Sequence, residues 1–209
     1  MKVAIRLGIA SRIILTIIIL ICLHSICFAD NWPSGTPKRE VYYSSNRQYR
    51  FEVLPGQHCR GILFRSHSGK TPHKLWESKL INSVSPYDVF VPDDGNYVVT
   101  FDNFNNVGYG SDVIVIYTKG GRLIRSLALE DILTANELSK IPISISSRWW
   151  HEDKNYYTYT DGILTLRVIQ IPWWVAFLNQ LNSIWGGEGG DRRQIIEMSI
   201  KLSTGRVLR

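Results

Sequence analysis

Short apolar runs rich in β-branched and aromatic residues alternate with polar, turn-forming segments through the middle of the chain. The apolar runs predict four strands, over residues 87–91, 97–101, 112–117 and 123–127. Between them lie Pro92-Asp93-Asp94-Gly95 and Lys119-Gly120-Gly121, whose residue types favour tight turns. Four short strands with tight turns predict an antiparallel meander. Residues 129–133, which follow, predict a short helical turn.

Two sequence landmarks recur and predict three such units. The first landmark is a tyrosine that begins a strand and follows a turn former and an amide side chain. It recurs at Tyr49, Tyr97 and Tyr156. A glycine and a basic residue that enter a strand recur at Gly69, Gly121 and Gly205. Tyrosine to glycine spans 20, 24 and 49 residues. The third unit therefore carries an insertion of about 25 residues, which we place within 171–192.

Residues 172–184 of this insertion predict a short helix that Gly186 and Gly187 end. Three sheets are too few for a closed propeller of four to eight blades. We therefore expect the helix to cover open sheet faces. The alternative is a surface for a partner or a membrane, because paired tryptophans such as Trp173 and Trp174 favour interfaces.

The run from Val91 to Thr100 resembles the turn-and-strand segment of WD40-like β-propeller blades, although Val115-Ile116-Tyr117 stands where their Trp-Asp ending would fall. The chain also resembles uncharacterised exported bacterial proteins, through Trp76, Leu80, Asn82, residues 94–103 and residues 108–110. These resemblances imply blade-like sheets and imply no activity. We predict an all-β fold of three antiparallel β-meander repeats, arranged as an incomplete propeller or an open sandwich.

The first 29 residues have the pattern of an export signal. Lys2, Arg6 and Arg12 precede or border the apolar run 13–23, and the segment ends on Ala29. The run has eleven residues, whereas a membrane-spanning helix needs about 20. We therefore expect a signal peptide over 1–29 that is cleaved after Ala29. Its retention as an N-terminal anchor is the alternative.

Residues 30–209 then form a single β-rich domain, periplasmic or extracellular. The formal charge of +6, less the three cations of the signal, leaves +3. No basic stripe with interleaved aromatic residues remains, which argues against a nucleic-acid partner. Cys59 is the only cysteine of this domain, so no disulfide forms within it, and we expect a buried thiol.

Histidines and this cysteine form the densest group of metal-ligand types: His58, Cys59, His67 and His73. Sulfur with imidazole suits copper or zinc. However, neighbouring residues on a strand point to opposite faces, and the spacing matches no standard zinc pattern. We therefore predict surface imidazoles beside a buried thiol, and no cofactor.

Two further groups carry candidate chemistry. Asp93, Asp94, Asp102 and Asn103 have the oxygen ligands that a hard cation prefers, but these residue types more often cap turns and polar loops; Asp102 and Asn103 are kept as candidate binding residues. Near residue 150, a hydrolase would need an acid, a base and a stacking platform. His151 and Glu152 are the candidate catalytic residues there, with Trp150 as a candidate binding residue, together with Trp173 and Trp174.

Spacing places no nucleophile or second base beside His151, and no G-x-S-x-G, H-E-x-x-H, P-loop or Rossmann sequence occurs. We therefore expect a non-catalytic exported domain that binds or scaffolds an envelope protein or glycan, with membrane contact only through a retained N-terminal segment. An exported hydrolase acting on glycan or peptide and a periplasmic metal-binding protein are the alternatives.

Overall fold

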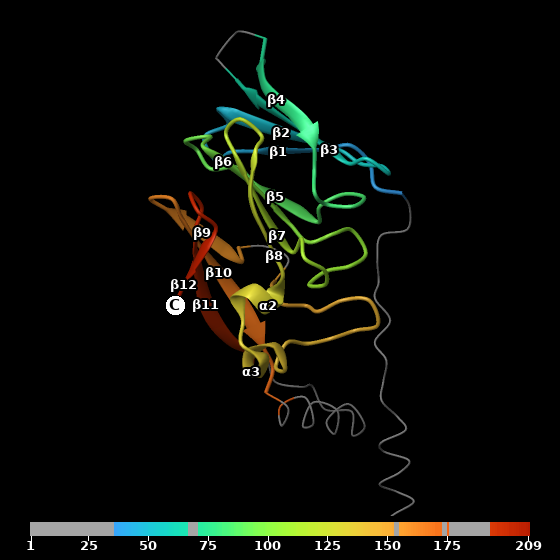
Figure 1. Ribbon diagram of the computed structural model, residues 1–209, viewed down its shortest axis with the longest axis vertical. Helices are drawn as coiled ribbons and strands as arrows, with labels where there is room; N and C mark the ends of the chain where they lie inside the picture. The colour runs from blue at the N-terminus through green and yellow to red at the C-terminus, as the bar shows by residue number, and fades with distance from the viewer. Residues whose placement is uncertain (1–35, 67–70, 153–154, 173–174, 176–192) are drawn as a thin grey trace, which may run out of the picture.

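Three four-stranded antiparallel sheets follow one another along the chain and form an open stack (Figure 1). The computed structural model describes residues 36–66, 71–152, 155–172, 175 and 193–209. Within each sheet the strands lie side by side in sequence order. The predicted all-β fold of three antiparallel meanders, not closed into a ring, is therefore confirmed. The predicted signal over 1–29, His67, Trp173, Trp174 and most of the insertion lie outside the described residues.

The strands and the two short helices have the following bounds. The first sheet contains β1 (Glu40–Tyr43), β2 (Tyr49–Leu54), β3 (Arg60–Arg65) and β4 (His73–Lys79). The second contains β5 (Asp88–Phe90), β6 (Tyr97–Phe101), β7 (Ile114–Thr118) and β8 (Leu123–Leu127). The helices α2 (Leu129–Ile132) and α3 (Ala135–Leu138) follow. The third sheet contains β9 (Tyr157–Thr160), β10 (Ile163–Gln170), β11 (Gln194–Lys201) and β12 (Arg206–Leu208).

The second sheet matches its predicted strands to within two residues, and α2 occupies the predicted helical turn. Gly121 lies two residues before β8 and Gly205 directly precedes β12, with φ angles of 77° and 66°. Glycine adopts this left-handed conformation without the steric cost that a side chain brings. The glycine landmark is confirmed at these two positions, and Gly69 lies outside the described residues.

The tyrosine landmark is wrong in the third unit. Tyr49 and Tyr97 begin the second strands of their sheets, whereas Tyr156 precedes β9, the first strand of its sheet. The turn before β10 is instead Asp161-Gly162, with φ angles of 51° and 80°. Two consecutive residues with positive φ form the turn that fits a two-residue hairpin. In the third sheet, an Asp-Gly turn therefore precedes the second strand, where the first two sheets have the tyrosine landmark.

The predicted insertion in the third unit lies between β10 and β11. These strands pair without interruption from Ile163 with Lys201 to Gln170 with Gln194. Residues 171–193 therefore connect the two strands at the end of the hairpin where Gln170 pairs with Gln194. Among the described residues, no helix is long and apolar enough to cross a membrane.

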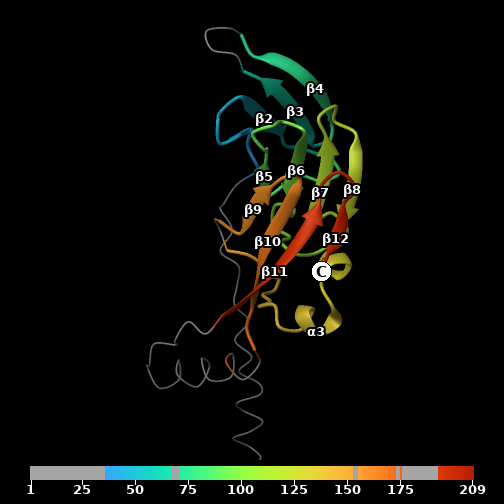
Figure 2. The ribbon, with the colours of Figure 1, turned by 90° about the vertical axis from the view of Figure 1, so that its left-hand side faces the viewer.

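The second sheet is the middle layer of the stack and is buried on both faces (Figure 2). Val98, Val115 and Tyr117 pack with residues of the first sheet. Val99 and Ile116 pack with residues of the third. Because successive side chains of a strand point to opposite faces, a strand between two layers needs apolar residues throughout. This explains the unbroken apolar sequence of β7.

Candidate functional site

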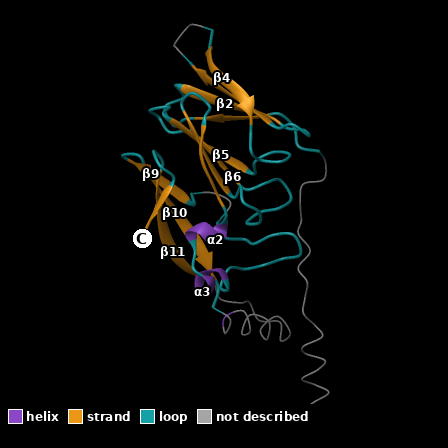
Figure 3. Cartoon of the chain, viewed as in Figure 1, coloured by secondary structure: helices purple, strands orange, loops and turns teal. Residues whose placement is uncertain are grey.

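Three loops meet along one side of the stack, on the right in Figures 1 and 3. We call residues 80–86, 102–110 and 140–150 together the loop platform. The backbone N–H of Phe104 donates to the Ser85 carbonyl oxygen at 2.9 Å. Ser83 N–H donates to Asn103 Oδ1 at 3.0 Å, and Arg148 N–H donates to the Val107 carbonyl oxygen at 2.9 Å. The platform is therefore one hydrogen-bonded assembly.

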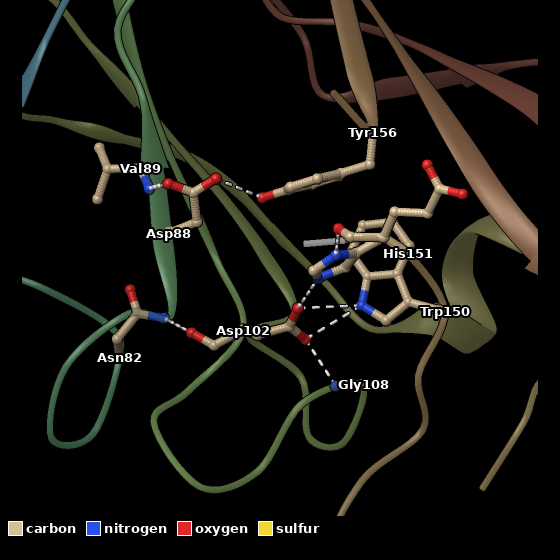
Figure 4. Close-up of polar contacts among 9 residues, drawn as sticks. Asn82, Asp88, Val89, Asp102, Gly108, Trp150, His151 and Tyr156 are labelled. Atoms are coloured by element: carbon tan, nitrogen blue, oxygen red, sulfur yellow. Dashed lines mark hydrogen bonds and ion pairs between the residues drawn. The ribbon is translucent and has the colours of Figure 1, made fainter. Parts of the chain in front are cut away.

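Asp102 is the centre of this assembly (Figure 4). It directly follows β6 and has a φ angle of 52°, a left-handed conformation that aspartate tolerates better than most residues. Its own backbone N–H donates to the Val113 carbonyl oxygen at 2.7 Å. Its carbonyl oxygen accepts a hydrogen bond from Asn82 Nδ2 at 2.8 Å. The first and second loops are thereby joined at the residue that ends β6.

The Asp102 carboxylate joins the second loop to the third. Oδ1 accepts from the Gly108 backbone N–H at 2.6 Å. Oδ2 accepts from Trp150 Nε1 at 3.0 Å and lies 3.0 Å from His151 Nε2. Trp150 and Asp102 are fully buried. Hydrogen bonds between buried polar groups satisfy atoms that would otherwise be costly to bury. Asp102 therefore fixes three chain segments at once.

His151 has an oxygen neighbour at each ring nitrogen. Nδ1 lies 2.6 Å from the Glu152 carbonyl oxygen, and Nε2 lies 3.0 Å from Asp102 Oδ2. A carbonyl oxygen only accepts, so Nδ1 carries a proton. Both ring nitrogens are therefore engaged by oxygen atoms of the described protein, and neither is left for a further ligand.

Aromatic rings enclose His151. The ring stacks on Tyr156 with centroids 4.0 Å apart and meets Trp150 edge-on at 4.4 Å. The Tyr156 hydroxyl donates to Asp88 Oδ2 at 2.8 Å, and Asp88 Oδ1 accepts from the Val89 N–H at 2.7 Å. Burial raises the pKa of Asp88 and the pKa of Tyr156. This half-buried carboxylate ties the third unit to β5.

The side chains of the candidate residues Trp150 and His151 are buried and in contact with each other, whereas the Glu152 carboxylate is exposed. The His151 side chain is 3 % exposed, whereas that of Glu152 is 40 % exposed and lies 4.0 Å from Arg193 Nη1. An acid–base pair needs groups within reach of the substrate proton. The described geometry therefore offers no open acid–base pair, and the hydrolase alternative stays an untested prediction.

The candidate metal ligands lie apart where they are described. His58 precedes β3 and His73 pairs with Arg65 at the other end of that strand. Both imidazoles are exposed, and Cys59 is fully buried, as expected. Burial raises the pKa of the Cys59 thiol to about 11, and the thiolate is the form that binds metal. Among the described residues, no three His, Cys, Asp or Glu side chains form a group that suits a metal ion.

The acidic residues near β6 also divide into two places. Asp93 and Asp94 lie in the turn before the strand, and Asp102 and Asn103 lie after it. Asp94 Oδ1 accepts from Asn96 N–H at 2.9 Å, in the manner of a capped turn. Asn103 Nδ2 donates to Asp112 Oδ2 at 2.7 Å. Turn and loop capping, rather than a shared cation site, accounts for these contacts.

Sequence reasoning missed the parts played by Asn82, Gly108 and Tyr156 in this network. Asp102 is 48 and 49 positions from Trp150 and His151, and no local pattern reports such pairs. Comparison with protein-family models, with curated proteins and with solved structures finds no match to the chain. The fold therefore defines an open stack of three blade-like antiparallel sheets, without an identified family.

Proposed function

We propose that this protein is an exported, non-catalytic domain that binds or scaffolds another component of the cell envelope through its loop platform. The observation that carries the proposal is the convergence of three loops on the buried, fully partnered Asp102. A buried network of this kind holds a surface in one shape. It does not present a reactive group to a substrate.

Apolar side chains on the platform support a binding role. Ile81 and Val84 are 45 % and 39 % exposed, and Ile143 and Ile145 are 68 % and 67 % exposed. Contiguous exposed apolar residues mark interaction sites, and these four residues lie on loops that are hydrogen-bonded through the second platform loop. A rigid loop loses little conformational entropy on binding, so the free energy of association is more favourable.

The sequence supports the envelope location through the signal pattern of residues 1–29. The partner classes that we propose are an envelope protein or glycan, with a retained N-terminal segment as a second tether. N-terminal sequencing of the protein recovered from cell envelopes tests cleavage after Ala29. A mature chain that begins at Asp30 agrees with the signal peptide, whereas a retained Met1 favours the anchor.

Site-specific photo-crosslinking in cells tests the binding role. A photoreactive amino acid replaces Ile145 on the platform, and a matched control carries it at Leu123, which is 42 % exposed. Leu123 follows the turn between β7 and β8, at the end of these strands away from the second platform loop. The proposal predicts a defined adduct from position 145 and none from position 123. A monomer without adducts from either position contradicts it.

A further inference from the structure

The turns that lead into β8 and β12 pack in the same way on the sheet that precedes each of them. A Cβ on Gly121 would lie 2.7 Å from Trp76 Cδ2 in β4, and a Cβ on Gly205 would lie 2.6 Å from Arg125 Cβ in β8. Each landmark glycine is therefore in close contact with the last strand of the preceding sheet. As a result, β4, β8 and β12 follow one another along one side of the stack (Figure 2).

This side of the second and third sheets carries charge of one sign. Residues 118–127 and 201–209 contain six Lys and Arg residues and no Asp or Glu. We call these two segments the basic edge. Arg209 lies 3.8 Å from Glu137, whereas the other five cations form no ion pair with the residues that the structure describes. These five are all exposed: Lys119, Arg122, Arg125, Lys201 and Arg206.

Lys201 and Arg206 are the centre of the basic edge. They lie directly opposite each other in the register of β11 and β12, and like charges in this position destabilise a strand pair. Arg125 reaches the same turn from the second sheet, where its Nη1 donates to the Gly205 carbonyl oxygen at 3.4 Å. Three cations therefore surround one turn, and an anion bound among them would remove their repulsion.

Neither a nearby carboxylate nor protection of the edge strand explains this arrangement. Asp161 lies in the neighbouring turn, where the Gly162 carbonyl oxygen accepts from Leu202 N–H at 2.9 Å, but it forms no ion pair with a described cation. Charged side chains also prevent an edge strand from pairing with another sheet. That role requires neither a single sign of charge nor two cations in direct opposition. The basic edge is instead suited to a negatively charged partner.

The spacing and composition of the basic edge favour an anionic sugar polymer. Cations occur at the turns of two consecutive sheets, and stacked sheets lie about 10 Å apart, so a partner that reaches both turns must repeat its charge along its length. Residues 118–122 and 203–206 are all Thr, Ser, Gly, Lys or Arg. They offer hydroxyl groups for hydrogen bonds and guanidinium groups for carboxylates, and they contain no apolar side chain that could enter a bilayer.

We infer that the basic edge binds an acidic glycan, a linear sugar polymer that carries carboxylate groups, through Lys201, Arg206 and Arg125. The inference goes beyond the proposed function, because it adds a second binding surface. The turn at residues 118–122 lies at the end of β7 and β8 away from the second platform loop. The glycan therefore binds without occupying that loop.

The control position of the crosslinking experiment does not belong to this surface. Leu123 pairs with Tyr117, which packs towards the first sheet, whereas Arg125 pairs with Ile116, which packs towards the third. Directly opposite residues of a strand pair share a face of the sheet. Leu123 therefore faces away from the cations at the turn before β12, and the two surfaces are tested separately.

Isothermal titration calorimetry of the purified protein with oligogalacturonate at low salt tests this inference. The fully methyl-esterified oligomer is the matched ligand control, because it keeps the sugar chain and removes its charge. Lys201→Gln/Arg206→Gln is the test variant. Lys38→Gln/Arg47→Gln is the matched control variant, because it removes the same charge from two exposed residues of the first unit.

The expected result is binding of the acidic oligomer and no binding of its methyl ester. Affinity should fall by about 3- to 30-fold in Lys201→Gln/Arg206→Gln, because two exposed charge pairs are lost, and should fall less in the control variant. Arg206→Glu places a carboxylate opposite Lys201 and removes the repulsion. It should therefore fold at least as stably as the wild type and yet bind the acidic oligomer more weakly.

Equal affinity of the wild type and the test variant overturns the inference. An equal loss in the control variant assigns binding to net charge and also overturns it. Binding to phosphatidylglycerol vesicles without binding to oligogalacturonate assigns the basic edge to a bilayer, with the same consequence. These results are independent of crosslinking from position 145, which tests the proposed function alone.

Discussion

Asp102 and His151 lie 49 positions apart in the chain, yet Oδ2 of one and Nε2 of the other are 3.0 Å apart and both side chains are buried. The pair connects the end of β6 with the segment that leads to the third sheet. Because Asp102 also accepts from Gly108 and Trp150, this one carboxylate determines how the loop platform is held. Its removal is therefore the sharpest perturbation that the fold offers.

Replacement of Asp102 by alanine is expected to lower the free energy of unfolding by about 3–5 kcal/mol, because it leaves buried donors without an acceptor. Denaturant titration of the folded protein measures this loss. Asp161→Ala is the matched control, since Asp161 has nearly the same φ angle, 51° against 52°, but is exposed. The free energy of unfolding that Asp161→Ala loses measures the cost of a left-handed backbone at alanine alone, about 1–2 kcal/mol. Equal losses in the two variants would contradict the hub role of Asp102.

Asp88 is expected to make stability depend on pH in the acidic range. Burial raises its pKa in the folded state, so between the unfolded and folded pKa values the native state binds a proton that the unfolded chain has released. Stability from this group is full below the unfolded pKa, about 4, and is lost as the pH rises through the folded pKa.

Asp88→Asn removes this titration and keeps an acceptor for the Tyr156 hydroxyl. Unfolding free energies of the two proteins, measured at a series of pH values from about 4 upward, should therefore diverge. The wild type should lose more stability than the variant as the pH rises. Parallel curves would show that Asp88 does not titrate differently in the folded and unfolded chains.

Gly121 tests the packing between the first and second sheets. A Cβ at this position would lie 2.7 Å from Trp76 Cδ2, and the φ angle is 77°. Gly121→Ala is expected to destabilise the protein by backbone strain of about 1–2 kcal/mol and by overpacking of about 1–3 kcal/mol. Gly162→Ala is the control, because φ is 80° there and no atom lies within 4 Å of the added Cβ. Thermal unfolding should show the smaller loss for Gly162→Ala.

The second sheet could be predicted from sequence because local chemistry determines it. Its strands are short apolar runs, and Gly95 and Gly121 supply the positive φ angles of its turns, 62° and 77°. The third sheet shows the limit of such patterns. There the turn before β10 uses Asp161 and Gly162, so the match at Tyr156 pointed to the wrong strand.

The candidate site was predicted only in its parts. Residue type places Asp102 in one candidate group and Trp150 with His151 in another, but the meeting of the two groups depends on the stacking of the second and third sheets. Asp93 and Asp94 were grouped with Asp102, although the length of β6 separates them. Contacts between residues near in the chain follow from local pattern, whereas contacts across layers follow only from the packed fold.

Hydrogen–deuterium exchange tests the hub role of Asp102 most directly, through the backbone N–H groups of Phe104, Gly108 and Arg148. Each is hydrogen-bonded within the loop platform, and local opening sets its exchange rate. In Asp102→Ala, exchange across residues 80–86, 102–110 and 140–150 should accelerate more than exchange in β2 and β3. In Asp161→Ala, exchange across the platform should accelerate no more than exchange in these two strands. Platform exchange in Asp102→Ala that matches the wild type would contradict the account.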